Sequence, residues 1–143
     1  MKVYKFGGAS IADAGRMTAL LPIITGEDQP LLIVLSALGK TTNALEVIVN
    51  HAYKGDDDGA LALAKQLEQQ HLDYARALLN DEYYAKAQEL LRPLFDEFER
   101  AIKDADGSSY DFSYDQVVCM GELFSSRLLF CLLMQHGIKT EWT

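Results

Sequence analysis

Two short runs of β-type residues alternate with longer stretches in which apolar residues recur at helical spacing. Residues 2–6 combine apolar and β-prone side chains, and residues 31–36 contain a continuous apolar run, so both ranges predict strands. A continuous apolar run is typical of a strand that is buried on both faces of a parallel sheet. Helical stretches that separate such strands indicate the α/β class.

Helical patterns occupy most of the remaining chain. Apolar spacing predicts helices over residues 11–25, 41–53, 57–79, 82–104 and 114–136. We expect a last strand to begin near Ile138, directly after a plausible helix cap at Gly137.

Several local signals predict where these helices begin or bend. Asp56–Asp58 place negative charge at a predicted helix N-terminus, where the helix dipole favours it. Ser113 and Gln116 have the spacing of a capping box at the start of the last helix. Pro22 and Pro93 lie inside helical patterns, so we expect them to kink or shorten those helices.

Residues 57–105 form a charged helical excursion from the predicted α/β pattern. Charged side chains recur on one face: Lys65, Glu68, Lys86, Glu89, Arg92, Asp96, Glu99, Arg100 and Lys103. This pattern indicates solvated helices that pack on the sheet or on a neighbouring domain. A regulatory or oligomeric contact is an open alternative for this region.

Composition narrows the class of partners. The 143 residues are 49% hydrophobic, enough for one domain with a core, and the formal net charge is −8. An acidic protein is a poor partner for nucleic acid or an anionic membrane, so we expect neither. Residues 117–134 are apolar, but Glu122 and Arg127 lie within them, which favours a buried helix over a membrane span.

The chain begins directly with a predicted strand and has no apolar targeting region, which predicts a cytoplasmic protein. Cys119 and Cys131 fall on one predicted helix, about 18 Å apart, so we expect core thiols and no disulfide. The three histidines show no metal-ligand spacing, and the sequence therefore predicts no metal site.

The turn after the first predicted strand has the features of an anion site. Lys5-Phe6-Gly7-Gly8-Ala9-Ser10 ends a strand with a lysine and enters a helix through paired glycines. Free backbone N–H groups and the helix dipole favour negative charge at such a turn. An ordinary turn with an exposed lysine has the same local pattern.

A second turn follows the second predicted strand. Ser36-Ala37-Leu38-Gly39-Lys40-Thr41-Thr42-Asn43 places small and hydroxyl residues at a strand's carboxyl end, where open α/β sheets bind ligands. Gly39-Lys40-Thr41 imitates the end of a Walker A loop, but Val34 occupies the position where that motif needs its first glycine. We therefore exclude a P-loop nucleotide site.

Glu122 is an unusual residue for its predicted helix. Between residues 117 and 134 only Glu122 and Arg127 are charged, and their spacing of five prevents an i,i+4 pair. A carboxylate on an apolar helix needs a partner from elsewhere. A substrate ammonium group, a salt bridge to another helix, or simple exposure would each account for it.

Three motifs together resemble aspartate kinases of the amino-acid kinase family: residues 5–10, Ser36-Ala37 with Thr42-Asn43, and Gly121-Glu122. Ala9 departs from the threonine that is usual in the first motif. The resemblance covers essentially the whole chain. It implies an amino-acid-kinase-like (carbamate-kinase-like) three-layer α/β/α fold with a mostly parallel sheet. Residues 1–143 would be its N-terminal lobe, with the helical excursion at about 57–105.

The resemblance also implies an activity, the ATP-dependent phosphorylation of the side-chain carboxylate of L-aspartate to 4-phospho-L-aspartate. This is the first step of the pathway to lysine, threonine and methionine. Carboxylate oxygen is already a nucleophile, so catalysis reduces to holding two anions together and neutralising the transferred group. Magnesium is expected to bind mainly through the ATP phosphates.

In this resemblance Lys5 contacts the ATP phosphates and assists the transfer, while Gly7, Gly8 and Ser10 supply hydrogen-bond donors. A helix N-cap is the other interpretation of Ser10.

Ser36, Thr42 and Glu122 are expected to bind the amino acid. For Thr42 the alternative is a cap on the helix that follows, and Lys40 is not expected to be catalytic.

Family members are much longer than 143 residues and continue with the rest of the nucleotide lobe and with regulatory ACT domains. We therefore expect little or no kinase activity from these residues alone, and a homo-oligomer for the full-length protein. Two alternatives are open. One is a related kinase that acts on glutamate, acetylglutamate, carbamate or a nucleoside monophosphate, and the other is a non-catalytic helical binding or regulatory module.

Overall fold

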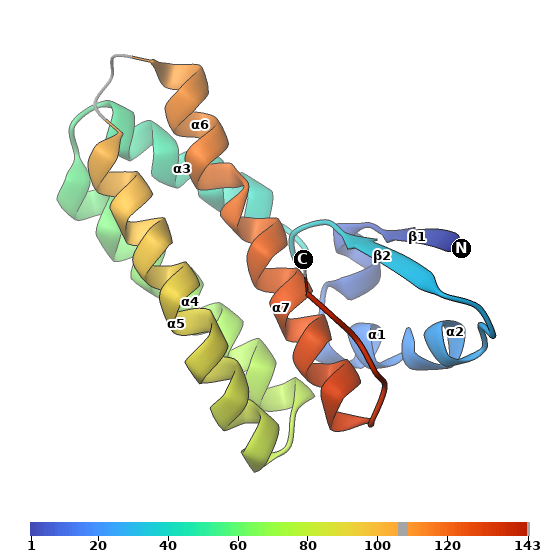
Figure 1. Cartoon of the computed structure of the whole chain (residues 1–143). Coiled ribbons are helices and arrows are strands. Elements are labelled where there is room, and N and C mark those ends of the chain that lie inside the picture. The colour runs from blue at the N-terminus through green and yellow to red at the C-terminus, as the bar shows by residue number, and fades with distance from the viewer. Residues whose placement is uncertain (106–108, 143) are drawn as a thin grey trace.

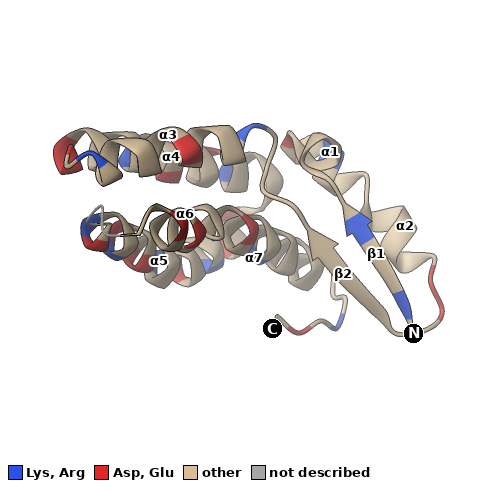
Figure 2. Cartoon of the chain, turned by 90° about the horizontal axis from the view of Figure 1, so that it is seen from above, with Lys and Arg blue, Asp and Glu red and all other residues tan. Residues whose placement is uncertain are grey.

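The computed structural model describes residues 1–105 and 109–142, which form a two-stranded sheet beside a bundle of long helices (Figure 1). The elements in chain order are β1 (Lys2–Phe6), the 3-10 helix η1 (Gly8–Ile11), α1 (Ala14–Thr18), α2 (Leu21–Thr25), β2 (Leu31–Leu35), α3 (Thr41–Tyr53), α4 (Asp57–Leu78), α5 (Asp81–Asp104), α6 (Tyr110–Val118) and α7 (Met120–Gln135). Helices α3 and α4 form one layer of the bundle, and α5, α6 and α7 form the other (Figure 2).

Strands β1 and β2 pair in parallel, with Lys2 opposite Leu31 and Phe6 opposite Leu35, which confirms the predicted α/β class. Side chains alternate between the two faces of the sheet. Val3, Leu32 and Val34 share one face and are 59%, 45% and 41% exposed. The expectation that the second strand is buried on both faces is therefore wrong for the described residues, because helices cover one face only.

The predicted helix over residues 11–25 is three separate short elements. Asp13 begins a new helix at α1, since its side chain accepts a hydrogen bond from the backbone N–H of Arg16 at 2.8 Å. Pro22 lies in the first turn of α2. Proline is tolerated there because the first N–H groups of a helix have no intrahelical partner. The break thus arises from local capping, which the apolar spacing alone did not reveal.

The last predicted helix begins earlier than residue 114 and is divided. Its N-cap is Ser109, whose hydroxyl accepts a hydrogen bond from the N–H of Phe112 at 3.3 Å. Ser113 is buried inside α6, so the predicted capping box is wrong. Cys119 lies at the junction of α6 and α7 and is exposed, whereas Cys131 is buried as expected, and both thiols are free.

The strand predicted near Ile138 does not form among the described residues. Side chains hold the segment that ends at Trp142 against α7. The indole N–H of Trp142 donates to Ser126 Oγ at 2.9 Å, and the Arg127 guanidinium lies 3.8 Å from the centroid of the Trp142 ring. Residues 140–142 and β2 both line a cavity of about 140 Å³. Among the described residues, β1 is the only strand that pairs with β2.

Helices α4 and α5 form the expected helical excursion, an antiparallel hairpin. Asp56 and Asn80 cap the two helices by accepting hydrogen bonds from Gly59 and Tyr83 backbone N–H groups. Of the expected kink or shortening at Pro93, the shortening does not occur, because helix α5 continues through Pro93 to Asp104. The hairpin packs on α1, α3, α6 and α7 rather than on the sheet.

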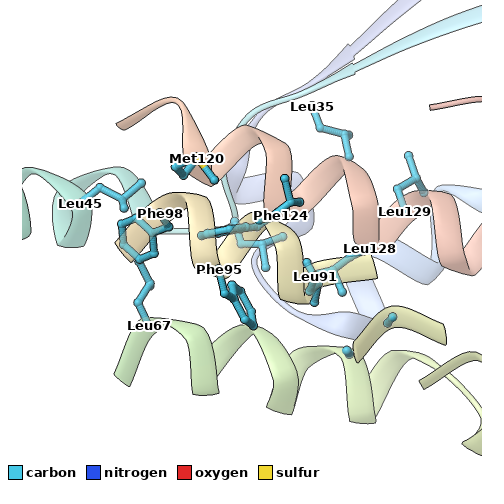
Figure 3. Close-up of a cluster of buried hydrophobic side chains, with 14 of the residues drawn as sticks. Leu35, Leu45, Leu67, Leu91, Phe95, Phe98, Met120, Phe124, Leu128 and Leu129 are labelled. Atoms are coloured by element: carbon cyan, nitrogen blue, oxygen red, sulfur yellow. The ribbon is translucent and has the colours of Figure 1, made fainter. Parts of the chain in front are cut away.

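Phe124 of α7 lies at the centre of the core that joins the two helical layers (Figure 3). Its ring makes edge-to-face contacts with His71, Phe95 and Phe98, at centroid distances of 5.0, 5.2 and 5.6 Å. Such contacts add to the free energy that burial of the aromatic ring provides. Helix α7 is thereby fixed against the hairpin along much of its length.

By length and composition, Tyr110–Gln135 could cross a membrane, but 56% of its most apolar window is buried inside the protein. This range also comprises two helices, α6 and α7, that meet at Cys119. The packing is that of core helices, and the expected absence of a membrane partner stays a prediction.

Glu68 is a carboxylate buried between α4 and α5, where its neighbours are Lys65, Asp96 and Glu99. Burial, followed by the nearby Glu99 carboxylate, raises the pKa of Glu68 to about 7. The unfolded chain loses this proton near pH 4.5, whereas the folded protein keeps it up to about pH 7. The free energy of unfolding therefore falls as the pH rises through this interval.

We expect Glu68→Gln to remove this pH dependence, which amounts to about 1 kcal/mol after allowance for screening by solvent. Denaturant unfolding of both proteins at pH 5 and pH 8 measures the effect. The matched control is Glu89→Gln, which changes an exposed glutamate of α5. Equal pH slopes for the wild type and Glu68→Gln would contradict the expected role of the buried carboxyl group.

Candidate functional site

The two glycine-containing turns meet at the carboxyl ends of β1 and β2. The N–H of Gly39, in the second turn, donates to the carbonyl oxygen of Gly8, in the first, at 3.1 Å. The N–H of Ser36 also continues the sheet by donating to Phe6 O at 3.0 Å. Because the strands are parallel, both turns lie at one edge of the sheet, where α/β proteins commonly bind ligands.

Gly8 and Gly7 differ in their surroundings. A Cβ atom on Gly8 would lie 2.7 Å from Ala37 O and 3.0 Å from Gly39 O, both of them backbone atoms. No atom lies within 4 Å of a Cβ placed on Gly7. Gly8 thus allows the close approach of the two turns, while Gly7 borders open space.

The start of α7 contacts the second turn. A Cβ atom on Gly121 would lie 2.8 Å from the Ala37 Cβ and 3.0 Å from Leu45 Cδ1. One turn later in the helix, Ser125 Oγ donates to Ser36 O at 2.8 Å. All three sequence motifs therefore come together at one place, although their residues span more than a hundred positions of the chain.

Lys5 is the penultimate residue of β1, opposite Val34. Its side chain lies on the exposed face of the sheet, and among the described residues it has no ion pair or side-chain hydrogen bond. Lys2 on the same strand pairs with Glu27 at 3.1 Å. Strand β1 contains two lysines and β2 has no charged residue, whereas acidic residues are spread over the helical layers (Figure 2). Lys5 is thus an uncompensated cation beside the first turn.

Neither Ser10 nor Thr42 occupies a helix-cap position. Ser10 lies within η1 and is exposed, and the cap of α1 is Asp13. Thr42 is the second residue of α3, is exposed, and follows the cap position Lys40. Both helix-cap interpretations are wrong. The exposed hydroxyl groups stay candidates for ligand contact.

Glu122 lies in the first turn of α7 and is exposed. Among the described residues no salt bridge involves it, and Arg127 stacks on Trp142 instead. Of the explanations left open for Glu122, a salt bridge does not form among the described residues, and exposure accounts for the missing partner. An exposed carboxylate that adjoins Gly121, and through it the second turn, remains available to bind a cation.

Two side-chain hydrogen bonds to the first turn were not predicted from the sequence. Arg16 Nη1 donates to Ala9 O at 2.8 Å, and the Tyr74 hydroxyl of α4 donates to Ile11 O at 2.9 Å. A pocket of about 340 Å³ lies between the second turn and α4, with Gly39, Lys40, Thr41, His71 and Tyr74 in its wall. The sequence offered no signal for Tyr74, because an aromatic residue at helical spacing is typical of any core.

In residues 1–105 and 109–142 there is no group of three or more His, Cys, Asp or Glu side chains that could hold a metal ion.

A family model described as "Amino acid kinase family" matches residues 1–143. Among curated proteins, the chain is 32% identical to bifunctional aspartokinase/homoserine dehydrogenase 2, chloroplastic, of Zea mays, with 98% of this chain and 16% of that protein covered. It is 31% identical to bifunctional aspartokinase/homoserine dehydrogenase 2 of Escherichia coli K12, with 99% of this chain and 17% of that protein covered.

Solved structures of E. coli aspartokinase III have the same fold. The complex with lysine and aspartate superposes with a TM-score of 0.83 at 24% identity, over 100% of this chain and 31% of that one. The complex with aspartate and ADP gives a TM-score of 0.82 at 22% identity, with the same coverage. The chain thus spans less than a third of the length of these similar proteins.

Proposed function

The chain belongs to the amino acid kinase family, and we propose that it forms the N-terminal part of the catalytic domain of an aspartate kinase. The proposed reaction transfers the γ-phosphoryl group of ATP to the side-chain carboxylate of L-aspartate and yields 4-phospho-L-aspartate. The meeting of the three motif segments at the carboxyl ends of β1 and β2 is the observation that carries the proposal. The aspartokinase names of the relatives above support it.

Phosphoryl transfer to a carboxylate needs charge neutralisation and positioning more than it needs a base. Lys5 is exposed beside the first turn and has no anionic partner among the described residues, so its charge is available to the ATP phosphates. In this proposal Gly7, Gly8 and Ser10 donate to those phosphates. Magnesium enters with ATP, bound mainly by its phosphate oxygens.

Recognition of aspartate is assigned to Ser36, Thr42 and Glu122. The exposed Glu122 carboxylate suits the substrate ammonium group, since it is an anion without an ion-pair partner among the described residues. The Ser36 and Thr42 hydroxyl groups would donate to substrate carboxylate oxygens. The Ser36 carbonyl is already occupied by Ser125, which fixes the second turn relative to α7.

The test is formation of aspartyl hydroxamate by the protein of the complete reading frame that contains these residues, with ATP and magnesium. We expect turnover with L-aspartate and not with glutamate, acetylglutamate or uridylate. Glu122→Ala should raise the KM for aspartate more than that for ATP, because the carboxylate is assigned to the amino acid. Residues 1–143 alone should show little or no turnover.

Turnover with another acceptor would assign the site to a different kinase of the family. A folded full-length protein with neither turnover nor ATP binding would refute the enzyme and favour a non-catalytic binding or regulatory module. Robust formation of aspartyl phosphate by residues 1–143 would contradict the expectation that the remaining lobe is required.

A further inference from the structure

Tyr74 connects the helical hairpin to the first turn. It lies on α4, and its hydroxyl donates to Ile11 O at 2.9 Å, with Asp13 O a second acceptor at 3.1 Å. These carbonyls belong to the backbone that follows Gly7-Gly8, more than sixty positions earlier in the chain. The contact is therefore a tertiary bond between two elements that no local helix or strand signal relates.

The backbone between Gly8 and Asp13 is held from three directions. The second turn holds Gly8 O through Gly39 N–H, and the exposed Arg16 holds Ala9 O. Tyr74 holds the end of the same segment from the hairpin. Ile11 itself is fully buried. Removal of one hydroxyl would thus release the far end of the segment while the other two contacts stay.

The Tyr74 hydroxyl group is suited to remain a hydrogen-bond donor throughout the physiological pH range. Burial of its phenol group, followed by the charge of Asp13, raises the pKa of Tyr74 above its ordinary value. The group therefore keeps its proton across the physiological pH range. A neutral hydroxyl that donates to main-chain carbonyls fixes their positions and adds no charge near an anionic ligand.

We propose that Tyr74 is a positioning residue that sets the conformation of residues 8–13 and thereby the alignment of the phosphate-binding N–H groups. This inference rests on the proposed function, because the phosphates are those of ATP. It gives the helical hairpin a role in catalysis, since a shift of α4 would be transmitted to the turn through one hydrogen bond. Small displacements of positioned groups lower the rate of the catalysed reaction substantially.

The variant that tests this is Tyr74→Phe, which keeps the ring and removes the donor. In the full-length protein we expect kcat/KM for ATP to fall about two- to tenfold, with the KM for aspartate unchanged. Backbone amide hydrogen exchange at residues 8–13 should become faster by a comparable factor. The matched control is Tyr114→Phe, which removes a hydroxyl bond of 2.8 Å from Tyr114 to Glu46, between α6 and α3.

Both variants lose one hydroxyl donor that bonds to another element, so a purely structural role predicts similar effects on stability and none specific to ATP. Unchanged exchange at residues 8–13 in Tyr74→Phe would overturn the inference. Equal changes of both KM values, or the same ATP effect in Tyr114→Phe, would also overturn it. A wild type without aspartate-dependent turnover would instead refute the proposed function and, with it, the catalytic role, while the exchange rates would still decide whether Tyr74 orders the turn.

Discussion

Lys5→Ala should lower aspartate phosphorylation by the full-length protein about 10²–10³-fold, the range found when one preorganised donor to a developing charge is removed. Lys5 is exposed at the end of β1 and has no ion pair among the described residues, so its loss should leave the fold intact. The decrease should appear mainly in kcat, because charge on the transferred group develops in the transition state. Steady-state kinetics with varied ATP and aspartate measure it.

The matched control is Lys2→Ala on the same strand. Lys2 forms an exposed pair with Glu27, and such pairs contribute little to stability. We expect its kcat to stay close to that of the wild type. Near-normal turnover in Lys5→Ala, with Lys2→Ala also active, would remove Lys5 from the catalytic role and reduce the first turn to an ordinary strand-to-helix connection.

Gly8→Ala and Gly7→Ala should change stability in opposite directions. At Gly8 the new methyl group meets two backbone oxygens, so the two turns must move apart, at a cost of about 1–3 kcal/mol of unfolding free energy. At Gly7 the backbone is extended, with φ −78° and ψ 167°, and the methyl group meets nothing. Alanine there should stabilise by about 0.4–1 kcal/mol, since it restricts the unfolded chain.

Denaturant unfolding of both variants, carried out on residues 1–143, tests this without any assumption about activity. In the full-length enzyme Gly7→Ala should also lower turnover, because its methyl group would occupy space that the proposal reserves for phosphate. Equal destabilisation by the two substitutions would mean that the close approach of the turns is not what Gly8 provides. A stable and fully active Gly7→Ala would argue against phosphate binding at that glycine.

The sequence predicted the elements that have strong local signals. Both strands and the helices α3, α4 and α5 were found within two residues of their observed bounds, because apolar periodicity and acidic first turns are local properties. The predictions failed where neighbouring signals compete. Asp13 and Pro22 each begin a new helix within one apolar pattern, and Ser109 caps α6 in place of Ser113.

Tertiary context explains the other errors. Whether a strand is buried on both faces, or whether residues after Ile138 pair with β2, depends on elements distant in the chain. For the candidate site, the sequence identified the three motif segments, and in the structure these segments lie in contact with one another. The sequence left three explanations open for Glu122, and its exposure depends on how α7 packs, which a local pattern does not show. The cytoplasmic location and the homo-oligomer stay predictions.

The contacts that hold the first turn have a consequence for synthesis of the protein. Translation begins at the N-terminus, so residues 5–10 leave the ribosome before Tyr74, Gly121 or Ser125 exist. The hairpin of α4 and α5 is local in sequence and can form quickly, whereas the bond from Tyr74 to Ile11 closes a loop of about sixty residues. The proposed phosphate turn is therefore made before the residues that hold it in place, and until α7 emerges the nascent chain has a glycine turn that lacks these contacts.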